Sequence, residues 1–192
     1  MEEFQVKILT DVTVEPVTLD EVKAFCRIDA DFYDDDNTLN MLIVSERERL
    51  EKVLNLSFSP KELQVRTYTN EITLPYGPVT TITSIKDSDG GYITDYDSYG
   101  LDFPTLVFNP VSNLNFFYPL GGGAPIVDGV NTTTLKDIVY LCGYVDLPKA
   151  LKNALLTQID YAYKNIGNPN MESISPIAFK LSYQYSRNPI IQ

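Results

Sequence analysis

The sequence contains no histidine and no tryptophan, and it has only two cysteines, Cys26 and Cys142. Without histidine, the chain lacks the general base of Ser-His-Asp and Cys-His arrangements and the commonest zinc ligand. Two cysteines cannot supply a four-thiolate metal site, and we interpret them as free, buried thiols of a protein made in a reducing cytosol.

Basic residues are also scarce, with 15 lysines and arginines against 26 aspartates and glutamates, so the net charge is −11. This balance opposes general binding to nucleic acid or to an anionic membrane surface, because both require a basic footprint. No apolar run approaches the roughly 18 residues that a membrane span needs. The N-terminal residues do not resemble a signal peptide either. We therefore expect neither membrane association nor export.

Patterns that carry catalysis or metal binding are missing as well. The acidic run Asp29–Asp36 does not fit a calcium-binding EF-hand loop, because Tyr33 occupies its fifth place, Asp34 its sixth and Asn40 its twelfth. We interpret the run as a solvated loop that caps a helix. The glycines 121–123 lack the lysine of a phosphate-binding loop, and no pair of carboxylates is marked as catalytic. We predict no catalytic residue, no metal site and no cofactor.

What is present begins with two amphipathic helices, predicted at about 18–28 and 36–55. Thr18 and Glu21 have the spacing of a capping box, and the acidic residues before position 37 supply the next helix start. Apolar residues then recur every three to four positions. The pairs Arg47–Glu51 and Glu48–Lys52 have i,i+4 spacing, and we expect both on solvent-facing surfaces.

A β region follows at about 63–144, where runs of Val, Ile, Thr, Tyr and Phe alternate with turn residues. The predicted strands are Leu63–Thr69, Glu71–Leu74, Val79–Lys86, Tyr92–Asp95, Ser98–Leu101, Thr105–Phe108, Asn115–Tyr118 and Leu135–Leu141. Residues 1–14 are predicted to form a further strand or an arm. The predicted strands follow one another closely, and this short spacing favours an antiparallel sheet or a small β-barrel over β-α-β units.

A third helix is predicted at about 147–166, with Pro148 in its first turn and a stop at Gly167. The remaining residues, 168–192, form a tail that contains a short helix starting at Ser175-Pro176. The tail is either a docking segment or a strap packed on its own domain. The sequence thus predicts an α+β fold: a small helical bundle with an inserted antiparallel sheet or barrel over 1–167, and an extended tail over 168–192.

Four segments, in order, resemble the head–tail connector (adaptor, or head-completion) family of tailed bacteriophages. The opening helix EPVTLDEVK, then Arg27-Ile-Asp29, an acidic gap and a long helix are similar to the start of that family. The segments Leu74–Val79 and Ile138–Tyr144, the latter leading into LPKALKNA, resemble its strand motifs. The tail from Ile177 to Arg187 is similar to its closing hydrophobic helix.

The resemblance implies a structural virion protein that forms a ring, generally dodecameric, between the portal protein and the next neck or tail-completion protein. Such a ring completes the head and extends the channel through which double-stranded DNA passes without specific binding. The protein would be assembled in the host cytoplasm and would reside at the head–tail interface of the virion.

With the resemblance as a frame, the charges and exposed helix faces lead us to expect roles for three groups of residues. The portal-docking residues are Ile177, Phe179, Leu181, Tyr183, Tyr185 and Arg187. The contacts between ring subunits are Arg47, Glu48, Arg49, Glu51 and Lys52. The acidic loop that we expect to line the channel contains Asp29, Asp31, Asp34, Asp35 and Asp36.

Two other classes stay open. A β-rich virion decoration or surface-binding module requires exposed aromatic residues clustered in the Tyr92–Tyr118 region. A hydrolase requires two acids that converge in a cleft, one of them with a raised pKa.

Overall fold

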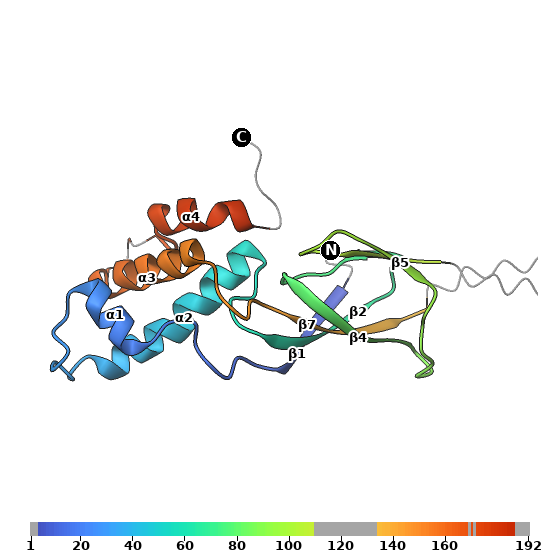
Figure 1. Ribbon diagram of the computed structural model, residues 1–192, viewed down its shortest axis with the longest axis horizontal. Helices are drawn as coiled ribbons and strands as arrows, with labels where there is room; N and C mark the ends of the chain where they lie inside the picture. The colour runs from blue at the N-terminus through green and yellow to red at the C-terminus, as the bar shows by residue number, and fades with distance from the viewer. Residues whose placement is uncertain (1–3, 110–133, 169, 171, 187–192) are drawn as a thin grey trace, which may run out of the picture.

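The computed structural model describes residues 4–109, 134–168, 170 and 172–186. Helices occupy one end of an elongated molecule and two β-sheets occupy the other (Figure 1). One strand, at Phe4–Thr10, precedes the first helix, and all the other strands are inserted between the second and third helices. The α+β class predicted from the sequence is confirmed.

The first two helices begin near the predicted positions. Helix α1 (Leu19–Cys26) starts with the predicted capping box: the Thr18 hydroxyl accepts from the Glu21 amide, and the Thr18 amide donates to the Glu21 carboxylate. It ends where Arg27 adopts a left-handed conformation, with φ 60°. Helix α2 (Asp36–Leu54) follows Asp35, but the Asp35 side chain makes no capping hydrogen bond. Its carboxylate instead accepts the hydroxyl of Tyr163.

The C-terminal helices differ from the prediction in two respects. Helix α3 (Lys149–Lys164) begins after Pro148, which is the N-cap residue and does not lie in the first turn. Pro148 suits that place, because the helix needs no hydrogen bond from the N–H of its N-cap residue and proline has none. The tail is not extended: it forms helix α4 (Pro176–Ser182) and the 3-10 turn η1 (Tyr183–Tyr185), and α4 packs on α3.

The larger sheet has the strand order β1-β2-β7-β4, and all neighbouring strands in it are antiparallel. Its strands are β1 (Phe4–Thr10), β2 (Lys61–Thr67), β4 (Val79–Asp87) and β7 (Lys136–Cys142). The residues predicted as a strand or an arm at the N-terminus are therefore an edge strand. The alternation of buried and exposed residues in β2 and β7 gives the sheet one apolar face.

The smaller sheet has the order β3-β6-β5, formed by β3 (Glu71–Thr73), β5 (Tyr96–Tyr99) and β6 (Thr105–Phe108). Apolar residues of both sheets form one buried cluster, which includes Leu63, Leu106 and Tyr140. The strand predicted at Tyr92–Asp95 is wrong, since only a single bridge joins Tyr92 to Lys86. The described strands form two open sheets and no closed barrel. The predicted strand Asn115–Tyr118 and the glycines 121–123 lie outside the described residues.

A second apolar cluster lies between the helices and contains Leu39, Ile43, Leu50, Leu151 and Leu155, all almost completely buried. The periodicity that predicted the helices therefore marks their contact faces. None of the described helices is both long and apolar enough to cross a membrane.

Close backbone contacts join the two layers. The amide of Gly143, at the end of β7, donates to the carbonyl of Pro78, and its Cα lies against the backbone of Ser59. The amide of Ser57 donates to Gly77, just after α2 ends. These contacts hold the C-terminal end of α2 beside the start of β4.

Candidate assembly surfaces

The junction between helices and sheets contains a buried network of charges. Glu51 of α2 accepts from Arg47 at 2.9 Å, from Lys61 of β2 at 2.8 Å and from the amide of Phe58. Arg47 also donates to Glu15 at 2.8 Å, so the network ties the segment before α1 to α2 and β2. Each charge is paired, which is what burial of an ion requires.

The network corrects one prediction from the sequence. Arg47 and Glu51 are each only 3% exposed, so this pair does not lie on a solvent-facing surface. Burial by itself would lower the pKa of Arg47, but the hydrogen bond to Glu15 and the charge of Glu51 raise it above its ordinary value. Lys61 could not be anticipated from local spacing, because it is ten residues from Glu51 and lies in a different layer.

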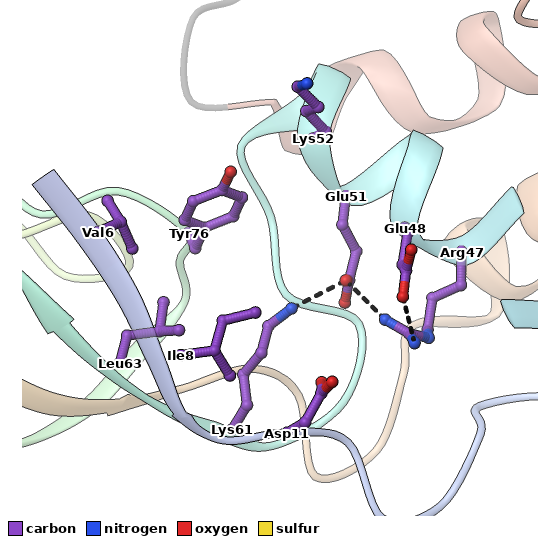
Figure 2. Close-up of a pocket in the computed structure, with 10 residues that line it drawn as sticks. All are labelled: Val6, Ile8, Asp11, Arg47, Glu48, Glu51, Lys52, Lys61, Leu63 and Tyr76. Carbon is purple, nitrogen blue, oxygen red and sulfur yellow. Dashed lines mark hydrogen bonds and ion pairs between the residues drawn. The ribbon is translucent and has the colours of Figure 1, made fainter. Parts of the chain in front are cut away.

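A groove of about 350 Å³ lies beside this network, between β1 and α2. Figure 2 shows Val6 and Ile8 of β1 on one side, α2 on the other, and Lys61 reaching between them to Glu51. Val6 and Ile8 are partly exposed, at 37% and 51%, although they share the apolar face of the larger sheet with Leu63. The groove is therefore apolar along β1 and charged along α2.

The outer side of α2 carries a continuous exposed stripe. Its members recur every three or four residues and are Asn37, Met41, Val44, Ser45, Glu48 and Lys52. Met41 is 66% exposed and Val44 is 40% exposed. The stripe is turned away from α3, because the opposite side of α2 contributes Leu39, Ile43 and Leu50 to the helical core. We call these six residues the α2 stripe.

Three predicted ring-contact residues remain, all on α2. Two of them belong to the α2 stripe, and the third contacts the tail. Glu48 and Lys52 are exposed members of the stripe, whereas Arg49 is half-exposed and lies on another side of α2. Arg49 forms an ion pair with Glu46 and donates to the carbonyl of Ser173. It therefore contacts the tail of its own chain.

The acidic loop between α1 and α2 is held by Lys23, which the sequence did not mark as functional. The Lys23 ammonium is buried, forms an ion pair with Asp36 at 2.5 Å and donates to the carbonyl of Phe32 at 2.8 Å. Asp35 accepts from Tyr163, and this hydrogen bond raises the pKa of the tyrosine. The three remaining acids, Asp29, Asp31 and Asp34, are exposed. Two of the five predicted channel-lining acids are therefore held by side chains of their own chain, and the other three are exposed.

The tail is fastened by Gln158 of α3, a residue that is completely buried. Its amide nitrogen donates to Glu46 at 2.8 Å and to the carbonyl of Ser173 at 3.2 Å, and its oxygen accepts from the amide of Ser175 at 2.8 Å. A glutamine on the buried side of α3 was the only sequence signal for this contact. We call these interactions the Gln158 clasp.

The structure separates the predicted portal-docking residues. Ile177 is 63% exposed, but Phe179, Leu181, Tyr183 and Tyr185 are partly buried. Phe179 and Tyr183 contact each other, and Tyr185 packs on the helical core. Arg187 lies outside the described residues. The described part of the tail is thus packed as a strap on its own helices.

The aromatic residues expected for a surface-binding module are described only up to Phe108, because residues 110–118 of that region lie outside the described residues. Tyr92 and Tyr99 are exposed, but Tyr96 packs against Phe108 and the ammonium of Lys86 lies over Tyr92. In the part of the chain that the structure describes, no three Asp, Glu, His or Cys side chains are placed to hold a metal ion. Both cysteines are free thiols there, and burial raises the pKa of each to about 11.

Comparison with solved structures shows which known fold this is. The chain is similar to a chain in the "Neck of empty GTA particle computed with C6 symmetry", with a TM-score of 0.68, 16% identity and 95% of each chain covered. It is also similar to one in the "Virion of native gene transfer agent (GTA) particle", with a TM-score of 0.66, 16% identity and 94% of each chain covered. For the "Neck of native GTA particle computed with C12 symmetry", the TM-score is 0.58 and the identity 14%, covering 95% of this chain and 94% of that one. The fold is therefore that of a neck protein.

The family comparison identifies the class more closely. Residues 16–88 match the model of the family described as "Phage gp6-like head-tail connector protein". This match and the neck fold confirm the resemblance to the head–tail connector family that was found in the sequence. No curated protein matches the chain.

Proposed function

We propose that this chain forms a ring, dodecameric by analogy with its family, between the portal and the neck or tail of a tailed phage. The observation that supports this most directly is the neck fold, which extends over 95% of the chain, together with the connector match over residues 16–88. In this proposal the protein resides at the head–tail interface of the virion, after assembly in the host cytoplasm. Residues 1–167 form the connector unit and residues 168–192 the docking tail.

The first test is the native mass of the purified chain, alone and mixed with the portal ring of the same phage. We expect about twelve copies to join each portal ring, and a monomer without the portal would show that the portal templates the ring. If the chain does not bind the portal ring in this assay, the proposal is refuted.

Portal attachment is assigned to the tail, and the structure sharpens the test for it. Removing all residues after 170 would also remove the partners of Gln158 and uncover α3, so loss of binding would be ambiguous. Deleting only residues 187–192 preserves every contact described above. We expect this shorter deletion to weaken portal attachment while thermal unfolding stays unchanged. Unchanged attachment would place the docking residues elsewhere.

The acidic loop is proposed to line the DNA channel through Asp29, Asp31 and Asp34. In Figure 1 the loop between α1 and α2 lies at the end of the molecule farthest from the sheets, where a ring could present it to a lumen. Carboxylates repel phosphate and leave no lasting basic contact, so DNA could pass without being held. Replacing all three aspartates by lysine should slow DNA ejection more at low salt than at high salt. A ring structure with this loop outside the lumen would contradict the assignment.

A further inference from the structure

We infer that the α2 stripe of one copy packs on the outer side of α4 of the next copy, and that this contact closes the ring. The inference rests on the proposed ring and names the two surfaces that build it. A ring of identical chains needs two different, complementary surfaces on each subunit, because each copy meets its neighbours head to tail. The α2 stripe and α4 meet that requirement.

The two surfaces lie on opposite sides of the helical layer. Figure 1 shows α3 between α2 and α4, and the α2 stripe is turned away from α3. The outer side of α4 is exposed at Pro176, Ile177 and Lys180, while its inner residues Ala178 and Ser182 are buried. Stacking one helical layer on the next therefore brings α4 of one subunit to α2 of its neighbour.

The helices also have compatible directions. Both α2 and α4 run toward the sheets in Figure 1. Neighbours in a closed ring differ only by a rotation about the ring axis, which is small when the ring has many members. The two helices would consequently meet in a nearly parallel arrangement.

The side chains on the two surfaces match in order and in charge. On α2 an exposed apolar residue, Val44, is followed one turn later by Glu48. On α4 the exposed Ile177 is followed one turn later by Lys180. Parallel helices in register therefore place Val44 near Ile177 and Glu48 near Lys180 of the next copy. Lys180 is the only charged residue between positions 173 and 186, so α4 is a basic site on a chain of net charge −11.

Charge exchange between Glu48 and Lys180 tests the contact. Glu48→Lys and Lys180→Glu should each reduce ring formation with the portal at least tenfold, and the double variant should restore it. The matched controls are Glu71→Lys on β3 and Lys149→Glu at the start of α3, which reverse other exposed charges away from both surfaces and should not affect the ring.

Covalent capture gives a second, independent readout. Val44→Cys and Ile177→Cys in one chain should yield a ladder of linked oligomers with a short bifunctional maleimide at pH 7. Each single variant should yield no ladder, because a head-to-tail contact joins unlike positions. The native cysteines should react slowly, since burial raises their pKa to about 11 and few thiolates exist at that pH.

The outcomes separate this inference from the proposed function. If the unchanged chain forms no ring, the proposed function fails. If it forms a ring that neither single charge reversal weakens, or that the double variant does not restore, the α2–α4 contact is wrong and the ring uses other surfaces.

Discussion

Glu51 is the residue on which the helical layer and the sheets jointly depend. Its carboxylate accepts from Arg47, Lys61 and the amide of Phe58. Glu51→Gln keeps the shape but removes the charge and turns an NH₂ group toward one of these donors. We expect a loss of about 3–5 kcal/mol in the free energy of unfolding, the usual effect of breaking a buried ion pair. Urea unfolding at neutral pH measures it.

The control is Glu48→Gln, three residues earlier on the same helix. The Glu48 side chain is 62% exposed and lies 3.6 Å from Arg47, so its loss should change stability by less than about 1 kcal/mol. Equal effects of the two substitutions would mean that the buried network does not stabilise the fold.

Cys142 should make stability fall at alkaline pH. Burial raises the pKa of its thiol to about 11 from an ordinary 9.0. Between those values the unfolded chain loses the proton while the folded chain keeps it, so stability decreases as pH rises through this window. One such group contributes at most about 1.4 kcal/mol per pH unit. Urea unfolding between pH 8 and pH 10.5, under reducing conditions, should show the decline.

Cys142→Ala isolates this contribution. The substitution also leaves a small cavity, but that cost does not depend on pH. Cys26 and Tyr144, whose pKa values are also raised by burial, are present in both proteins and cancel in the difference. The alanine variant should show a shallower decline, and an identical slope would contradict the prediction.

At the scale of single elements, α1 depends on its capping box. Thr18→Ala removes the hydroxyl that accepts from the Glu21 amide and leaves a helix donor unsatisfied. The expected loss of stability is about 0.5–2 kcal/mol, measured by thermal or urea unfolding. Thr13→Ala provides the same chemical change at an exposed residue without a described side-chain hydrogen bond. A comparable loss in that control would remove capping as the explanation.

Helix α4 depends on the Gln158 clasp. Gln158→Ala leaves the buried amide of Ser175 unsatisfied, which costs about 1–3 kcal/mol, and removes one of the partners of the Glu46 carboxylate. Because α4 packs chiefly on α3, the cost should appear as local opening. Amide hydrogen exchange should accelerate over residues 173–185 and stay nearly unchanged in α1 and β7. Gln184→Ala, at an exposed residue of η1, should have no such effect.

At the scale of the whole molecule, the close approach at Gly143 sets how the layers meet. Gly143 has φ 109°, and a Cβ there would lie 2.2 Å from the carbonyl oxygen of Ser59, which belongs to the backbone. Gly90 also has a positive φ, of 84°, but a Cβ would meet nothing within 4 Å. Gly90→Ala should therefore cost only the conformational penalty of about 1–2 kcal/mol.

Gly143→Ala carries that penalty and a steric clash, because the strand and the segment before β2 must separate. Overpacking of this kind adds roughly 1–3 kcal/mol. Urea unfolding of the two variants measures the difference directly. If both cost the same, the junction is more adaptable than the close contact indicates.

Local signals account for what could be predicted from the sequence. The capping box of α1, the apolar periodicity of α2 and α3, and the strand at Thr105–Phe108 depend on neighbours within a few residues. The order of the connector-like motifs could also be read directly, because it is a property of the sequence and does not depend on the fold. These features predicted the fold class and the family resemblance correctly.

Two of the misjudged features depend on distant residues. Arg47 and Glu51 look like a surface pair, because i,i+4 spacing does not reveal that Glu15 and Lys61 meet them from outside the helix. The tail looks extended, because its clasp comes from Gln158 on another element.

The sequence by itself determined the elements, their order and the family resemblance, since each arises from short-range hydrogen bonding and apolar periodicity. Only the tertiary structure decided which charges are buried at the junction, where α4 packs and which side of α2 stays open. Those outcomes depend on groups brought together across the whole chain, and the free energy of pairing and burying them exists only once the layers have met.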